Sequence, residues 1–142
     1  MQAENYYRSN CPINLAVEVI GDKWTLLIIR DLMFEDKRHF REFLIGEEKI
    51  ASNILTDRLT KLETEGIITK KSDPSHKQKF VYSLSAKGID LLPVIIKLGA
   101  WSMKYQPVDK DRFPHAGEMA KAGEPAKRKI RNELARKHLG KK

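Results

Sequence analysis

Apolar positions recur at helical spacing through the first part of the chain. After Pro12 they return every three or four residues up to residue 20, and proline suits the first turn of a helix because its missing N–H would have no partner there. Residues 23–33 are apolar on almost every side, which predicts a buried central helix capped by Asp22. A short third helix is expected around residues 40–44. These segments predict a helical core.

The next segment separates its apolar and polar positions onto two faces. Ser52 is expected to cap a helix over residues 53–65. At about 100° per residue, three leucines spaced four and three apart fall on one stripe, and polar side chains fall opposite them. The polar face consists of Asn53, Thr56, Asp57, Thr60, Lys61 and Thr64. This face is either an ordinary solvated surface or a surface that reads a polar partner.

A strand, turn and strand pattern follows this helix. Residues 67–71 and 80–84 are rich in β-branched and aromatic side chains, and the turn-forming segment 72–79 separates them. The pattern predicts a two-stranded β-hairpin with a basic tip. Ser85 is then expected to cap one long helix over residues 86–105, kinked at Pro93. This helix carries more apolar residues than a lone surface helix needs.

Charge is distributed unevenly along the 142 residues, whose net charge is +8. Residues 1–106 contain 16 Lys and Arg against 14 Asp and Glu, whereas residues 107–142 contain 11 against 5. We therefore expect a domain over 1–106 and a basic extension over 107–142 that is flexible or partly helical, with a helix at 125–139. The cluster at 127–131 either keeps the extension soluble or adds sequence-independent affinity for DNA.

Several classes of protein are disfavoured by composition. The chain has no run of about 20 uncharged apolar residues and no basic-then-apolar start, so we expect neither a membrane span nor a secretory signal, and a cytoplasmic location. A single cysteine, Cys11, excludes an intramolecular disulfide and a multi-cysteine zinc site. Four scattered histidines, without a phosphate-binding loop or a Ser-His-Asp motif, indicate no enzyme, metal site or cofactor.

The order of the predicted elements is that of a winged helix-turn-helix, an α+β, mainly α fold whose recognition helix enters the DNA major groove. Eight segments also stand in a characteristic order. They are CPI at 11–13, GDKWT at 21–25, RHFREF at 38–43, LTDRL at 55–59, LETEGII at 62–68, YSLSAKG at 82–88, LLPVI at 91–95 and Trp101. In this order they resemble the HxlR branch of the MarR-like winged-helix regulators, over roughly residues 10–105.

This resemblance implies a homodimeric transcription factor that binds a palindromic operator in double-stranded DNA. It also implies that the first and last helices of the domain form the dimer contact. Two features depart from the family pattern: the link at 45–50 is unusually acidic, and the segment after residue 106 has no counterpart. A winged helix could instead serve RNA binding or protein assembly. The effector, if there is one, is left open.

The fourth helix supplies most of the residues expected to contact DNA. Asn53 can pair with adenine in bidentate fashion, Thr56 can contact a thymine methyl group or a base edge, and Asp57 can accept from cytosine or support Arg58. Arg58 and Lys61 are expected to hold phosphates. In the hairpin Lys79 is favoured, since the family often carries an arginine there. The predicted DNA-binding residues are Ser52, Asn53, Thr56, Asp57, Arg58, Lys61, Lys77 and Lys79.

Cys11 precedes the proline that opens the first predicted helix. That position is the N-cap, where unpaired backbone amides and the helix dipole favour a thiolate. The alternative interpretation is a small buried apolar residue. Because some members of the resembling family use a cysteine here to sense oxidants or electrophiles, the resemblance suggests that modification of Cys11 changes the dimer and its DNA affinity.

Overall fold

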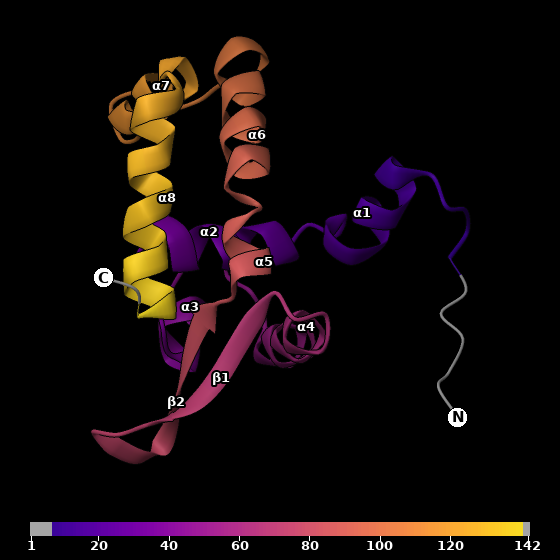
Figure 1. The fold of residues 1–142 in the computed structure, drawn as a ribbon, viewed down its shortest axis with the longest axis vertical. Helices are drawn as coiled ribbons and strands as arrows, with labels where there is room; N and C mark the ends of the chain where they lie inside the picture. The colour runs from indigo at the N-terminus through magenta and orange to yellow at the C-terminus, as the bar shows by residue number, and fades with distance from the viewer. Residues whose placement is uncertain (1–6, 141–142) are drawn as a thin grey trace.

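The computed structural model describes residues 7–140, except for the side chains of residues 77 and 78. A two-stranded hairpin projects from one end of the helical part of the fold, and the last two helices lie beside the longest middle one (Figure 1). The elements are α1 (Pro12–Ile20), α2 (Thr25–Phe34), α3 (Phe40–Leu44), α4 (Ser52–Thr64), β1 (Ile68–Asp73), β2 (His76–Leu84), α5 (Ala86–Ile89), α6 (Leu92–Tyr105), α7 (Pro114–Lys121) and α8 (Glu124–Leu139). The α+β, mainly α winged helix-turn-helix expected from the sequence is confirmed.

The core forms around α2, as its apolar sequence predicts. Ile29 and Leu32 of this helix are almost completely buried, and they belong to one cluster with the three leucines of the α4 stripe. Helix α2 begins two residues later than predicted. The N-cap is Trp24 rather than the predicted Asp22, but the Asp22 carboxylate accepts hydrogen bonds from the backbone N–H groups of Trp24 and Thr25, each at 3.1 Å, in the turn that leads into the helix.

The start of α4 corrects one prediction. Ser52 is already helical, and the N-cap is Ala51, whose backbone is extended. The Ser52 carbonyl oxygen instead accepts a hydrogen bond from the Thr56 hydroxyl at 2.9 Å. The other end of the helix is as expected: Gly66 has a φ of +74°, the left-handed conformation that lets a glycine end a helix.

The hairpin has longer strands and a shorter turn than predicted. Strands β1 and β2 pair antiparallel from Ile68 opposite Leu84 to Asp73 opposite His76, so most of the predicted turn is strand. The Asp73 carboxylate closes the remaining turn by accepting from the N–H and hydroxyl of Ser75, at 2.8 and 2.6 Å. Backbone pairing across the ladder overrides the turn preference of the polar side chains.

The predicted long helix over 86–105 is two helices, α5 and α6. Ser85 caps the first by accepting from the Gly88 N–H at 3.1 Å, as predicted. Pro93 lies in the first turn of α6 rather than at a kink, because proline has no N–H to continue the preceding helix and its ring crowds that turn. A Cβ at Gly88 would lie 2.3 Å from the Ile67 carbonyl oxygen, so only glycine allows α5 this close to the hairpin.

The extension after residue 106 contains the helices α7 and α8 in its described part. Helices α7 and α8 lie beside α6 (Figure 1), and Leu134 of α8 is only 3% exposed within the core. The His138 ring of α8 contacts both β2 and α2. Its Nδ1 accepts a hydrogen bond from the Leu84 N–H at 3.0 Å, and its Nε2 lies 3.1 Å from the Leu32 carbonyl oxygen. Burial of apolar side chains such as Leu134 thus stabilises the packing of α8 on the core, although the segment is basic overall. The domain boundary at residue 106 stays a prediction.

Candidate nucleic-acid interface

The polar face of α4 is fully open to solvent. Asn53, Thr56, Asp57 and Thr60 are all exposed, while the leucines on the opposite side of the helix anchor it in the core. The helix therefore presents one row of hydrogen-bonding side chains on a rigid support. This arrangement suits contact with base edges, because the polar groups are directed outward and their backbone is fixed from behind.

Arg58 fixes α4 to the start of α2. Its Nε donates to the Asp22 carboxylate at 2.8 Å, and its guanidinium also forms an ion pair with Asp57. Partial burial alone would raise the pKa of Asp22, but hydrogen bonds from Thr25 and Arg58 outweigh it and lower this pKa to about 2. Asp22 is therefore ionised at neutral pH, and a phosphate would have to compete with it for Arg58.

Lys61 also makes a contact within the protein. Its Nζ donates to the Glu18 carbonyl oxygen of α1 at 3.1 Å. Sequence reasoning assigned Arg58 and Lys61 to phosphates and missed both internal contacts, which join residues 36 and 43 positions apart. The sequence offered one signal for an internal partner, the alternative that Asp57 supports Arg58, and the structure shows that ion pair. The roles of these two residues toward DNA stay predictions.

The hairpin presents cations beside α4. The Lys70 ammonium lies over the Phe80 ring, 4.2 Å from its centroid, and Lys79 is exposed on β2. A hollow of about 60 Å³ separates this part of the hairpin from α4, with Thr56, Thr60 and Lys70 in its wall. Lys77 lies in β2, but its side chain is outside the described residues. The hairpin thus has the position and charge of a DNA-binding wing.

The base of the wing is pinned by Arg38, in the connection between α2 and α3. Its Nε donates to the Tyr82 carbonyl oxygen at 2.8 Å, and its guanidinium donates to the Ser83 hydroxyl at 2.6 Å. The Tyr82 N–H in turn donates to the Arg38 carbonyl oxygen at 2.8 Å. Arg38 was part of a recognised motif, but a contact spanning more than forty residues has no local pattern that could reveal it.

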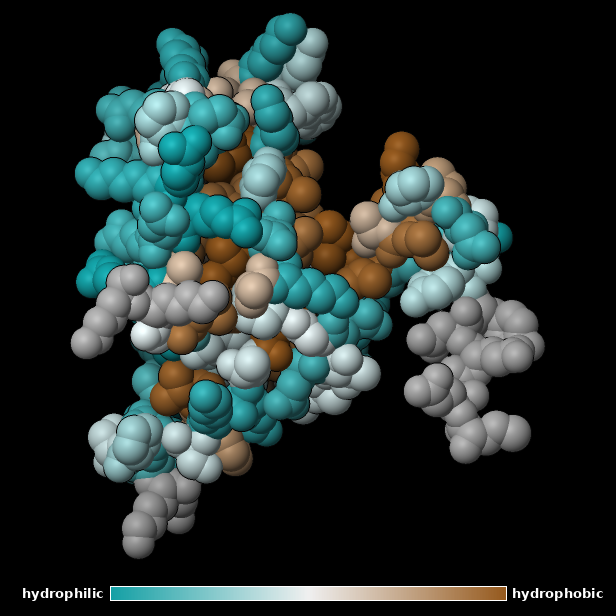
Figure 2. Space-filling view, viewed as in Figure 1, coloured by the Kyte–Doolittle hydropathy of each residue, from teal (hydrophilic) through white to brown (hydrophobic). Residues whose placement is uncertain are grey.

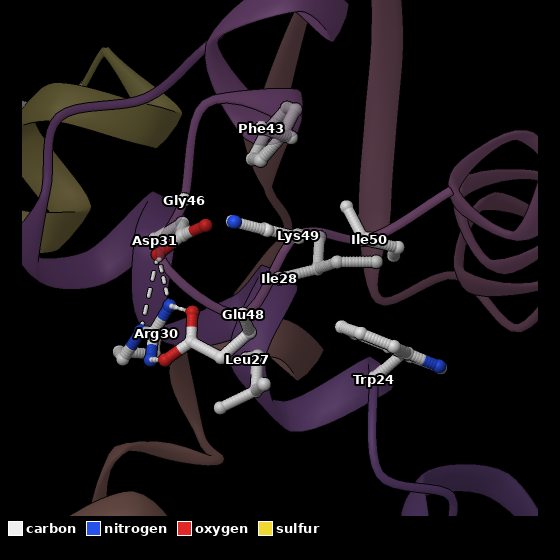
Figure 3. Close-up of a pocket in the computed structure, with 10 residues that line it drawn as sticks. All are labelled: Trp24, Leu27, Ile28, Arg30, Asp31, Phe43, Gly46, Glu48, Lys49 and Ile50. Atoms are coloured by element: carbon white, nitrogen blue, oxygen red, sulfur yellow. Dashed lines mark hydrogen bonds and ion pairs between the residues drawn. The ribbon is translucent and has the colours of Figure 1, made fainter. Parts of the chain in front are cut away.

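Glu48 of the acidic link at 45–50 forms an ion pair with Arg30 of α2. Figure 3 shows Arg30 between Asp31 and Glu48, and its guanidinium donates to the Glu48 carboxylate at 2.9 and 3.0 Å. Lys37 reaches Asp31 at 3.3 Å. The hollow beside these residues has a volume of only about 10 Å³, no more than the space of one water molecule. The link therefore forms a structural ion-pair network rather than a ligand pocket.

Cys11 is exposed at the N-cap of α1, so the interpretation of a buried apolar residue is wrong. The backbone amides of Asn14 and Ile13 at the start of the helix lower the pKa of its thiol. Within the described part of the chain, no group of three or more His, Cys, Asp or Glu side chains could hold a metal ion. In the same residues, no helix is both long and apolar enough to cross a membrane.

Comparison with known proteins identifies the family. Residues 19–110 match the family model described as HxlR-like helix-turn-helix. The chain belongs to this family. An HTH-type transcriptional regulator of Synechocystis sp. is 37% identical to this HxlR-like chain over 93 residues, which cover 63% of this chain and 68% of that relative. The HxlR-like chain is thus a transcriptional regulator with a helix-turn-helix DNA-binding fold.

Two solved structures are similar to the HxlR-like chain in both sequence and fold. The redox regulator HypR in its oxidised form is 30% identical, with a TM-score of 0.61, and the match covers 69% of this chain and all of HypR. The reduced form of the transcriptional regulator YodB from Bacillus subtilis is 31% identical, with a TM-score of 0.58, over 71% of this chain and all of YodB. The family match ends at residue 110, before α7 and α8 begin.

Proposed function

We propose that this HxlR-like chain binds a palindromic operator in duplex DNA as a homodimer. Helix α4 enters the major groove, and the wing contacts the flanking backbone or minor groove. The observation that carries this proposal is the exposed polar face of α4, held against α2 by the Arg58 and Asp22 pair and flanked by a wing that Arg38 pins in place. A rigid reading helix with a fixed cationic neighbour suits a defined DNA sequence better than a random one.

Exposed apolar side chains on two helices support the homodimer. Figure 2 shows hydrophobic side chains at the surface over α1 and along α6, and α1 stands away from the other helices in Figure 1. These side chains, 38 to 75% exposed, are Ile13 and Val17 in α1 and Val94, Leu98, Trp101 and Tyr105 in α6. A second copy carries the same two stripes, so a two-fold arrangement could bury both at once.

The direct test is selection of duplex sites from a random pool by the purified full chain, in reduced and oxidised samples at the same salt concentration. A two-fold dimer predicts enrichment of an inverted repeat whose half-sites lie about one helical turn apart, or a multiple of it. If binding is strong and salt-sensitive but no sequence is enriched, the protein is a non-specific DNA binder and the operator proposal fails.

Asn53→Ala is expected to lower the affinity for the selected duplex roughly five- to a hundredfold, because a bidentate contact to adenine is lost. Binding to a duplex of random sequence should change little. Fluorescence anisotropy with both duplexes measures the two affinities. Equal losses on both would contradict the assignment of Asn53 to base reading.

Two further variants are measured with the same two duplexes, one to test a phosphate contact and one as a control. Lys79→Ala should weaken binding to both duplexes and reduce the slope of log affinity against log salt by about 0.9, the value for one phosphate contact. Lys121→Ala removes one exposed lysine of α7, away from α4 and the wing, and serves as the matched control, with both affinities unchanged. A salt slope that Lys79→Ala leaves unaltered would remove Lys79 from the interface.

Oxidation of Cys11 is proposed to change DNA affinity, because HypR is described as a redox regulator and the Cys11 thiol is exposed with a lowered pKa. The chain has one cysteine, so a disulfide must join Cys11 of two copies or Cys11 and a small thiol. In the first case hydrogen peroxide takes two electrons and two protons from two thiols and yields a disulfide and two water molecules.

Mild peroxide treatment is expected to change the affinity of the native chain for the selected duplex and to leave Cys11→Ser unaffected. Mass spectrometry identifies the oxidised product, and the thiol reductant dithiothreitol should restore the original affinity. A Cys11→Ser protein that responds to peroxide as the native chain does would eliminate the sensing role. This result would leave the operator proposal intact.

A further inference from the structure

The tip of the wing is tied to α3 through one histidine. His39 is the N-cap of α3, and its ring lies between two carboxylates from different elements. Its Nδ1 is 2.8 Å from the Glu42 carboxylate of α3, and its Nε2 is 2.9 Å from the Asp73 carboxylate at the end of β1. The Asp73 side chain is only 12% exposed and that of His39 is 33% exposed. This contact joins residues 34 positions apart.

The protonation state of His39 follows from its two partners. An ionised carboxylate only accepts hydrogen bonds, and a neutral imidazole has a single N–H to donate. Both contacts are therefore complete only when the ring is a doubly protonated imidazolium. Hydrogen bonds to Glu42 and Asp73 accordingly raise the pKa of His39.

The two carboxylates remain ionised across the neutral pH range. Hydrogen bonds from Ser75, and then from His39, lower the pKa of Asp73 to about 2. Burial would raise the pKa of Glu42, but hydrogen bonds from the Arg38 and His39 N–H groups and the His39 ring lower it. The neighbouring Arg38 guanidinium is directed toward Tyr82 and Ser83 of β2. A second histidine, His76, lies opposite Asp73 in the ladder. His39 is the group joined to both carboxylates, and its charge changes near neutral pH.

The His39 contact acts at the end of the wing that Arg38 does not hold. Arg38 binds the hairpin at Tyr82 and Ser83, near its base, whereas Asp73 also closes the turn at the tip. Helix α3 packs against α4, so a tie between α3 and Asp73 sets the position of the wing tip relative to α4. Cations on the wing can meet phosphates only if that position is maintained.

We propose that the imidazolium of His39 is a positioning group for the wing, and that loss of its proton weakens binding of duplex DNA. This inference rests on the DNA-binding function proposed above. A raised pKa gives the direction: the clamp is complete below the ordinary pKa of histidine, about 6.5, and is lost as the pH rises through the higher value in the folded protein. DNA affinity should therefore fall with rising pH over this interval.

The first experiment measures affinity for the selected duplex at constant salt, from about pH 6 to about pH 8.5. The native chain is expected to lose about three- to tenfold in affinity, the loss of one charge-assisted hydrogen bond. His39→Gln should bind at all pH values as weakly as the native chain does at the alkaline end. His39→Arg, which stays charged, should keep the acid-form affinity throughout and so restore function without a titrating group.

His115→Gln is the matched control, because His115 forms a similar pair with Glu118 of α7, at 3.4 Å and away from the wing. It should keep the native pH profile. Parallel pH profiles for the native chain and His39→Gln would overturn the proposal, since the response would then come from another group.

A second measurement tests the clamp without DNA. Nuclear magnetic resonance of the imidazole nitrogens in the full chain should show that Asp73→Asn lowers the titration midpoint of His39. An unchanged midpoint would overturn the clamp, whatever the DNA result. If every variant fails to bind duplex DNA while the midpoint shifts as expected, the clamp is present and the DNA-binding proposal has failed.

Discussion

Leu98→Asp is expected to convert the proposed dimer to a monomer and to lower the affinity for the selected duplex by about a hundredfold or more. Leu98 is 47% exposed in the middle of the α6 stripe, between Val94 and Trp101. An aspartate buried between two copies would be a charge without a partner, which is costly in an apolar interface. A monomer also loses the gain in affinity from binding two linked half-sites, which reaches about a hundredfold to ten-thousandfold.

Analytical ultracentrifugation and anisotropy measure the two effects on the same samples. Asn132→Asp is the matched control, because it adds the same negative charge to an exposed position on α8 and should change neither mass nor affinity. Circular dichroism establishes that both variants are folded. A Leu98→Asp protein that remains a dimer with native affinity would show that the α6 stripe does not form the interface.

Leu134→Ala is expected to destabilise the whole protein by about 2–5 kcal/mol, the usual cost of truncating a buried leucine. Leu134 belongs to the same buried cluster as residues of α2, α4 and β2, and it is 3% exposed. A typical domain is stable by only about 5–15 kcal/mol, so this is a large fraction of the total. Chemical denaturation followed by circular dichroism gives the free energy of unfolding.

Arg128→Ala, at an exposed position of the same helix, is the control and should change the free energy by less than about 0.5 kcal/mol. The extension and the rest of the fold should unfold in one transition, because α8 shares the core and His138 bonds to both Leu84 and Leu32. If Leu134→Ala has the same midpoint denaturant concentration of unfolding as the native chain, α8 does not contribute to the stability of the domain.

Local pattern predicted the features that depend on neighbouring residues. The leucine stripe of α4 and the Gly66 stop follow from helical periodicity and end chemistry, and the structure confirms both. Predictions failed where two local preferences competed. Ser52 favours an N-cap, yet Ala51 takes that place; Pro93 suggested a kink, yet it opens a new helix.

The candidate DNA interface also has features that the sequence predicted and features that it did not. The exposed row on α4 was predictable, because a helix with one apolar stripe must present its other face to solvent. The internal partners of Arg58 and Lys61 were not, since a cation that could meet a phosphate looks the same in sequence as one that meets a carboxylate or carbonyl. Only the fold shows that Asp22 and Glu18 are within their reach.

The order of a winged helix-turn-helix and the exposed polar face of α4 were thus determined by spacing and residue type, which act over a few neighbours. The packing of α8 into the core, the pinning of the wing by Arg38 and the clamp of His39 between Glu42 and Asp73 were decided by tertiary structure. The last of these joins the cap of one helix to a turn 34 residues away. Hydrogen bonds and ion pairs depend on distance in space, and for residues this far apart in the chain that distance is set when the core packs.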